Sequence, residues 1–448
     1  MQIKAFARIV LLIVLTTIAL QWAWGAAAHS EAAYDYINIS EPFLKKIPVA
    51  VPVFKAMTES EEAEDAARQA TDILNDGLGF TGYFKLVDPG AFLENPRDKG
   101  ITAADLNFDN WTDVGAELLI TGGLWVNDDD TVRMEIRLFD TFKGELLFGK
   151  RYGGSQSDLR QMIHRFCDEM MYRLTGKRGL FGSQIVFINK QDKQNAIYIC
   201  GFDGHTPRRL TESQAITLFP AWSPDGASIA YTSYAGGSPS IIIKRIDNGE
   251  TRRIAYDGIN ITPTWLPGQG GLAATLSVSG DEEIYLLTES GKIDKKLTDS
   301  WGIDVSPTFS PDGKKMAFVS KRAGSPQIYI KNLETDETRR LTYEGSYNTE
   351  PDWSPDGEKI AYSAMEGGQA DIFVIGADGE GLTQLTRNAG SNESPGWSPD
   401  GTLIVFSSTR SGTAKLYVMT ASGTDQRPLL EMPGEQILPD WSPSMEIK

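Results

Sequence analysis

The stretch NTEPDWSPDGEKIAYSA, residues 348–364, places Ser354 close to two acids, Glu350 and Asp356. Such a group is either a reactive centre or the turn of a hairpin. In SPDG the proline fixes φ, the aspartate bonds the turn backbone and the glycine accepts the left-handed conformation. The same serine recurs in this motif at Ser223, Ser310 and Ser398. A nucleophile repeated at every hairpin has no mechanistic use, so we interpret the stretch as a β-hairpin turn.

The stretch belongs to a repeat that begins near Ile185 and continues to the C-terminus with a period of about 44 residues. Its clearest column is aromatic and reads Trp222, Trp265, Phe309, Trp353, Trp397 and Trp441. Four short strands in each period are typical of one blade of a β-propeller. We name these strands a to d, with the aromatic residue in strand a, and expect it to pack between blades.

The two ends of the repeat are out of phase. The first set opens with strands b, c and d at Ile185, whereas the last strand a, at Trp441, is followed by no further set. The sets are complete if the C-terminal PDWSP pairs with the first three strands, which also removes the exposed edges of a linear array. The sequence therefore predicts a small α/β N-terminal domain followed by an all-β six-bladed β-propeller closed by the C-terminal strand.

Composition changes divide the chain into four parts. Residues 1–28 carry Lys4 and Arg8 before a short apolar run and small residues, which is typical of a cleavable secretory signal; a retained membrane anchor is the alternative. Residues 29–176 alternate strands and helices, with a last helix capped by Ser157 and ended by Gly176. We expect a linker at 177–183 and the propeller at 184–448.

The overall charge limits the partners. The chain has a formal net charge of −17, which repels phosphate backbones, so we expect no nucleic-acid partner and no direct membrane insertion of the mature chain. An oxidising compartment permits a bridge between Cys167 and Cys200, but their apolar neighbourhoods favour two buried thiols.

Patterns for catalysis are weak. The sequence has no G-x-S-x-G elbow and no H-E-x-x-H motif, and its histidines are His29, His164 and His205. We expect no enzyme activity and no cofactor. Calcium in the propeller channel remains open, because carboxylates that meet at an axis suit that ion.

Two regions are candidates for binding a protein. The loops that lead from each strand d to the next strand a differ from one another and are polar, as binding loops on a regular scaffold often are. We expect their exposed contacts to be Asn260, Thr262, Asp304, Ser306, Asn348, Thr349, Glu350, Asn392 and Glu393. The second region is a flexible N-terminal arm, Ser30 to Ser40, which could pair with the sheet edge of a partner or lie against its own domains. Its candidate contacts are Tyr34, Tyr36, Ile37 and Ile39.

The order of signal, small α/β domain, linker and P-x-W-S-P-D-G repeats ending in a bare WSP resembles the TolB family of Gram-negative envelopes. The resemblance implies a non-catalytic periplasmic scaffold of the Tol–Pal system that supports outer-membrane integrity and constriction during cell division. It implies that the propeller rim binds the lipoprotein Pal, near the loops INITP and IDVSP, and that the N-terminal arm binds TolA. Outer-membrane proteins are further candidate partners.

Two other hypotheses for the function stay open at this point. One is an exported six-bladed propeller hydrolase or lactonase that uses a metal in the channel. The other is a regulatory propeller for an unrelated envelope protein.

Overall fold

The computed structural model describes residues 46–447 except 128, 193, 213–214 and 269, so the signal and the N-terminal arm lie outside the described residues. The first domain is built on a mixed sheet in the order β3-β1-β4-β5-β6, with β2 also pairing with β4. Its strands are β1 Ile47–Ala50, β2 Lys55–Ala56, β3 Phe84–Leu86, β4 Leu118–Val126, β5 Thr131–Asp140 and β6 Glu145–Ser155.

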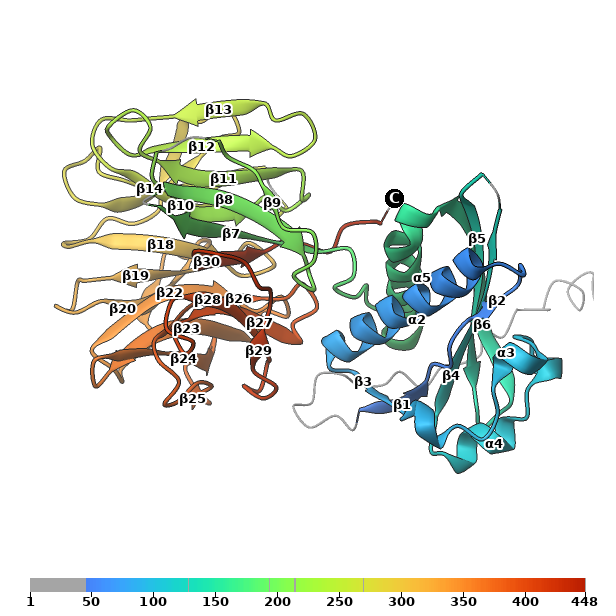
Figure 1. Ribbon diagram of the computed structural model, residues 1–448. Helices are drawn as coiled ribbons and strands as arrows, with labels where there is room; N and C mark the ends of the chain where they lie inside the picture. The colour runs from blue at the N-terminus through green and yellow to red at the C-terminus, as the bar shows by residue number, and fades with distance from the viewer. Residues whose placement is uncertain (1–45, 128, 193, 213–214, 269, 448) are drawn as a thin grey trace, which may run out of the picture. The chain divides into compact units, whose positions relative to one another are not determined.

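Two long helices cover one face of this sheet (Figure 1). The first, α2 Glu61–Thr81, begins where the Ser60 side chain accepts a hydrogen bond from the Ala63 N–H, and acids fill its first turn. The second, α5 Leu159–Thr175, ends at Gly176, whose φ of 72° makes it a left-handed cap, as the sequence predicts.

The predicted cap at Ser157 is wrong. Ser155 and Asp158 form a reciprocal capping box around the short 3₁₀ turn η3 Gln156–Asp158, which precedes α5. The sequence analysis also missed the short elements between β3 and β4, whose apolar runs are too brief to show a period. These are η1 Pro89–Ala91, α3 Pro96–Lys99, η2 Ala103–Asp105 and α4 Phe108–Asp113.

Strand alternation gives the sheet two apolar faces. In β4, Leu118 and Ile120 pack in the cluster that includes α2 and α5. Leu119 points the other way, into a smaller cluster with Trp111 of α4 and Phe139 of β5. The domain is therefore a three-layer α/β unit, with long helices on one face and a short helix on the other.

Residues 177–183 lead from α5 to the propeller. Leu180, Phe181 and Ser183 in this segment are buried, so the connection is packed along part of its length. Cys167 and Cys200 are free buried thiols, as the sequence favours, and burial raises the pKa of both.

The remainder folds into six four-stranded antiparallel sheets, which confirms the predicted propeller. Five of the sheets are consecutive in sequence. Their strands are β10 Thr217–Trp222, β11 Ser228–Ser233, β12 Ser240–Arg245 and β13 Thr251–Ile254; β14 Asn260–Trp265, β15 Leu272–Leu276, β16 Glu283–Leu287 and β17 Ile293–Lys296; β18 Asp304–Phe309, β19 Lys315–Ser320, β20 Gln327–Asn332 and β21 Thr338–Arg340; β22 Tyr347–Trp353, β23 Lys359–Glu366, β24 Gln369–Gly376 and β25 Thr383–Gln384; β26 Asn392–Trp397, β27 Leu403–Ser408, β28 Lys415–Thr420 and β29 Arg427–Pro428.

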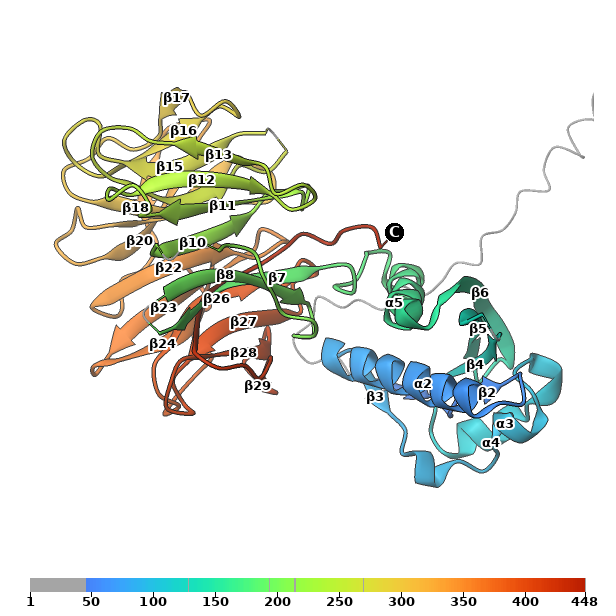
Figure 2. The same ribbon diagram turned by 45° about the horizontal axis from the view of Figure 1, so that its top comes forward.

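The sixth sheet joins the two ends of the repeat. Strand β30 Glu435–Trp441 pairs antiparallel with β7 Gln184–Gln191, and β8 Gln194–Gly201 and β9 Arg208–Arg209 complete the blade. β30 lies beside β7 in Figure 1, and β8 lies beside β7 in Figure 2. Closure by the C-terminal strand is thus confirmed.

The aromatic column packs between blades, as expected. Trp353 lies in one buried cluster with Ile328 and Ile330 of the preceding blade, and Trp397 lies in another with Ile372 and Val374. Each tryptophan fills the space that two twisted sheets leave between them.

None of the helices in the described part of the chain combines the length and the hydrophobicity that a bilayer crossing needs.

Replacing Trp441 by alanine tests what holds the ring together. Trp441 is 6% exposed, pairs with Ile185 across the closing strands and donates from Nε1 to the Ser183 hydroxyl at 2.7 Å. We expect Trp441→Ala to lower the free energy of unfolding in urea by about 3–5 kcal/mol. Trp301→Ala is the matched control, because that side chain is 82% exposed, and should change it by no more than about 0.5 kcal/mol. Equal losses in both variants would contradict this account of closure.

Candidate functional site: the channel and the rim of the propeller

Every inner strand carries the same irregularity. Its ladder shifts register at one residue with positive φ that is followed by proline. Proline has no N–H to give to the ladder, so the chain bulges there. The left-handed residues, with φ between 47° and 56°, are Phe219, Thr262, Ser306, Glu350, Ser394 and Leu438. We call this set the axial ring.

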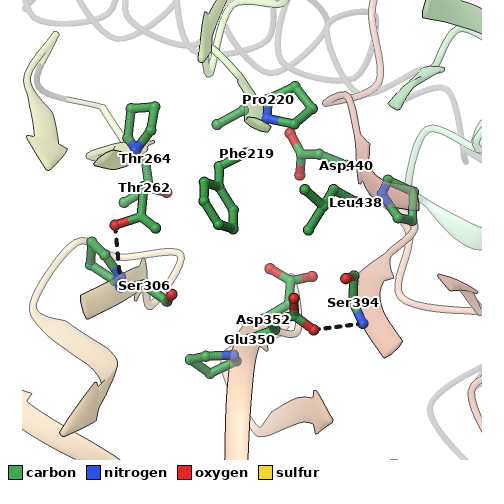
Figure 3. Close-up of a pocket in the computed structure, with 15 residues that line it drawn as sticks. Phe219, Pro220, Thr262, Thr264, Ser306, Glu350, Asp352, Ser394, Leu438 and Asp440 are labelled. Atoms are coloured by element: carbon green, nitrogen blue, oxygen red, sulfur yellow. Dashed lines mark hydrogen bonds between the residues drawn. The ribbon is translucent and has the colours of Figure 1, made fainter. Parts of the chain in front are cut away.

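The axial ring borders a cavity of about 140 Å³ at the centre of the propeller (Figure 3). Phe219 and Leu438 point into it from neighbouring inner strands, and Glu350 points into it from the other side. The charged side chains that line it are Glu350, Asp352 and Asp440, with no lysine, arginine or histidine among its described lining residues. The cavity is therefore lined by both acidic and apolar side chains, with Asp440 on the side of Leu438 and the other two acids opposite them.

Each of these carboxylates bonds to the next blade. Asp352 Oδ2 accepts a hydrogen bond from the Trp397 N–H at 2.8 Å, and Asp440 Oδ2 accepts one from the Trp222 N–H at 2.7 Å. Glu350 Oε2 accepts from the Ser394 N–H at 2.9 Å and from the Ser363 hydroxyl at 3.0 Å. The acids thus tie neighbouring inner strands together.

Burial opposes the charge on these acids. It raises the pKa of Asp352 to about 7 and that of Asp440 to about 8, and the charge of Asp352 adds to the rise at Asp440. Burial also raises the pKa of Glu350, although the hydrogen bond from Ser363 acts in the opposite direction.

The chemistry that the cavity offers is limited. Within the described ranges, no group of three or more His, Cys, Asp or Glu side chains is arranged to hold a metal ion. The described residues therefore offer no such donor set for the calcium that the sequence left open. Calcium binding stays a hypothesis, which titration of the protein with calcium would test.

Ser354 is part of a turn. Its hydroxyl donates to Asp356 Oδ1 at 2.6 Å and accepts from the Lys359 N–H at 2.9 Å, and Gly357 closes the turn with a φ of 78°. The same contacts recur at Ser223, Ser310 and Ser398. The hairpin interpretation is confirmed.

Two of the histidines lie in described parts of the chain. His164, in α5, is buried, and burial lowers its pKa to about 4. His205 lies in the β8–β9 turn, with Nδ1 3.2 Å from Asp203 Oδ2. Neither lines the cavity.

The loops between strands d and a and the turns between strands b and c share one rim, because the strands of each blade are antiparallel. We call it the binding rim. The expectation that the polar residues at the start of the inner strands are exposed there is wrong. Asn260, Asp304, Asn348 and Asn392 are all fully buried.

Hydrogen bonds explain the burial of these four side chains. Asn260 exchanges hydrogen bonds with the backbone of Tyr256, and Asn348 donates to the Glu344 carbonyl, each at 2.8 Å. Arg322 donates to Asp304 Oδ2 at 2.8 Å. Arg410 likewise donates to Asn392 Oδ1 at 3.0 Å. These hydrogen bonds fix the conformation of the loops. Polar groups that are buried away from water generally bond to other protein groups in this way.

The other predicted contacts divide between axis and rim. Thr262, Ser306 and Glu350 belong to the axial ring. Thr349 is partly exposed and Glu393 is exposed at the binding rim. Binding by these residues stays a prediction. Tyr34, Tyr36, Ile37 and Ile39 lie outside the described residues.

The sequence analysis missed the most distinctive feature of the binding rim, its exposed apolar side chains. In the described part of the propeller, all but one of the exposed large hydrophobic residues lie there, the exception being Ile293. Those at the rim are Ile216, Val278, Trp301, Tyr343, Tyr347 and Met365. The signal was present, since Trp301 and Tyr343 fall in loops between strands d and a and Tyr347 begins β22, all outside the aromatic column.

The fold and these surfaces define a two-domain protein: a six-bladed propeller with a recessed acidic axis and an apolar binding rim, preceded by an α/β domain. Comparisons with known proteins agree. Family models match residues 171–445, as the TolB beta propeller domain, and residues 35–147, as the TolB amino-terminal domain. The chain belongs to the TolB family.

Individual relatives support the same assignment. Over 271 residues the chain is 54% identical to the Tol-Pal system protein TolB of Desulfosudis oleivorans, covering 60% of this chain and 62% of that one. It is 45% identical to a TolB homolog of Chlorobium chlorochromatii, covering 60% of each. The matched stretch thus spans less than two thirds of these relatives. The crystal structure of TolB from Acinetobacter baumannii superimposes with a TM-score of 0.77 at 26% identity, over 89% of this chain and 97% of the other.

The half-buried acids of the cavity predict an unusual pH dependence. Asp352 and Asp440 have raised pKa values, so the native state binds more protons than the unfolded chain between about pH 4 and 8. Stability should therefore fall as pH rises through this range, by at most about 1.4 kcal/mol per pH unit for each carboxyl. Urea unfolding at pH 5, 6, 7 and 8 measures the slope.

In the double variant Asp352→Asn/Asp440→Asn, each amide oxygen can still accept the backbone hydrogen bond, but neither side chain titrates. The contribution of these two groups to the slope of stability against pH should therefore disappear. Glu358→Gln, at an exposed carboxylate, is the control and should keep it. A double variant with the slope of the unaltered protein would refute the assignment.

Proposed function

We propose that the chain is a non-catalytic periplasmic scaffold of the Tol–Pal system that binds a Pal-like lipoprotein through the binding rim. Membership of the TolB family supports the system, and a relative at 54% identity carries the name Tol-Pal system protein TolB. The observation that carries the proposal is the concentration of exposed apolar side chains at one rim. Large exposed apolar surface on a soluble scaffold usually marks a contact with another protein.

A scaffold role also fits the chemistry of the propeller. The repeated serines are used in turns, and the cavity acids bond to backbone N–H groups of neighbouring strands. These structural contacts explain why the serines and acids are present without a catalytic role. The rival hydrolase or lactonase needs a channel metal, and no observation on the described residues favours it.

The second contact in the proposal is the N-terminal arm, Ser30 to Ser40, which we assign to TolA. It precedes β1 and carries Tyr34, Tyr36, Ile37 and Ile39, whose side chains favour a strand added to the sheet of a partner. A protein with two separate contacts can couple an inner-membrane machine to Pal at the outer membrane. We propose that outer-membrane integrity and constriction at division depend on this coupling, with outer-membrane proteins as further partners.

Removing the arm separates the two contacts. We expect deletion of residues 30–40 to abolish binding to purified TolA while the affinity for the soluble domain of the Pal-like lipoprotein from the same genome stays within about twofold, because the two sites share no residue. Isothermal titration calorimetry with each partner measures both.

A variant with residues 30–40 scrambled at constant composition is the control for length and charge, and should behave like the deletion. Equal loss of both partners would contradict separate sites. Failure of the unaltered protein to bind the lipoprotein domain would overturn the proposed function itself.

A further inference from the structure

The exposed apolar side chains of the binding rim are not spread evenly. Val278, Trp301, Tyr343, Tyr347 and Met365 lie over three consecutive blades, β14–β17, β18–β21 and β22–β25. We call these five residues the rim patch. Trp301 and Tyr343 are the most exposed, at 82% and 73%. Exposing apolar side chains of this size to water is unfavourable in free energy. A partner that covers them removes this penalty.

Backbone contacts join the loops that carry the rim patch. The Asp304 N–H donates to the Glu282 carbonyl at 2.9 Å, which links the loop of Trp301 to the turn of Val278. The Asn348 N–H donates to the Pro326 carbonyl at 3.0 Å, which links the next loop to the turn before it. The Lys321 N–H donates to the Ile303 carbonyl at 3.0 Å, which joins the loop of Trp301 to that same turn. Tyr347 and Met365 are direct neighbours across strands β22 and β23. The loops that carry the patch are therefore connected along the rim.

Stacked arginines hold the same loops from below. Arg322 lies over the rings of Phe318 and Tyr329, at 5.4 and 4.9 Å from their centroids, and bonds to Asp304. Arg340 lies 4.9 Å from the ring centroid of Tyr343. Loops fixed in this way lose little conformational entropy when a partner binds, which favours affinity.

Acids surround the rim patch. The exposed carboxylates in the loops and turns of these three blades are Asp257, Asp281, Asp299, Glu344 and Glu366. Lys321 and Arg387 are the exposed bases in the described binding-rim loops and turns of the same blades, and Arg322 is engaged with Asp304. Asp299 Oδ1 lies 2.6 Å from the ammonium of Lys296, which pairs with it. The border of the patch is thus predominantly negative.

We propose that the rim patch docks a protein whose contact face is apolar at its centre and rich in lysine or arginine at its edge. The aromatic side chains supply the anchors of such an interface, and opposite charges at its border speed the encounter. The inference rests on the proposed function, because the Pal-like lipoprotein is the partner that it describes.

The experiment measures binding of the soluble lipoprotein domain by surface plasmon resonance at 50, 150 and 500 mM salt. For the unaltered protein we expect the association rate to fall at least tenfold across this range, because salt screens the acidic border. Trp301→Ala and Tyr343→Ala should each weaken the affinity at least tenfold, mainly through faster dissociation. The double variant Glu344→Lys/Glu366→Lys should slow association and reduce its salt dependence.

Two controls use the opposite rim. Ile293→Ala removes an exposed apolar side chain there, and Glu358→Lys reverses an exposed charge; both should bind like the unaltered protein. The rim-patch variants change exposed side chains, so their unfolding midpoints should match that of the unaltered protein, which excludes misfolding as a cause.

The outcomes separate the two proposals. Binding that is tight in the unaltered protein but unchanged by salt and by the rim-patch substitutions would overturn this inference and leave the proposed function standing. Absence of binding by the unaltered protein would overturn both.

Discussion

The ring depends on one non-local pairing, between β30 Glu435–Trp441 and β7 Gln184–Gln191. Within every other blade the strands are joined by short turns, so each blade can form from local contacts. The closing pair brings together segments from the two ends of the repeat, and only then do six inner strands surround a common axis. The cavity and the binding rim both exist because this closure holds.

The bulge of the inner strands converts the regular repeat into a site. A left-handed residue followed by proline interrupts each ladder, which places six side chains around the axis without altering the strands on either side. The residue two positions before it, such as Asn348 before Glu350, remains in the ladder and is buried beneath the loop. Neighbouring polar residues in one short loop therefore have different surroundings and different roles.

This explains what the sequence predicts well and what it does not. The period of the tryptophans and the phase of its ends are enough to predict six blades and their closure, because each follows from spacing alone. Exposure in the loops does not follow from spacing. Asn348 is polar yet fully buried, since its amide nitrogen donates to Gln327 and to the Glu344 carbonyl, whereas Trp301 is apolar yet 82% exposed. Ser157 failed as a helix cap for a similar reason, because Ser155 forms the reciprocal bonds with Asp158.

Both the axis and the binding rim vary in character around the ring. At the axis, Leu438 and Phe219 are apolar and come from the neighbouring strands β30 and β10. The polar members Thr262, Ser306, Glu350 and Ser394 come from β14, β18, β22 and β26. The first three of these strands are the inner strands of the blades that carry the rim patch. If ring closure were the only constraint, the sectors would not need to differ, because neighbouring blades pack in the same way all around the ring. The overlap between the polar part of the axis and the rim patch supports the proposal that one sector of the ring, and not its whole circumference, contacts a partner.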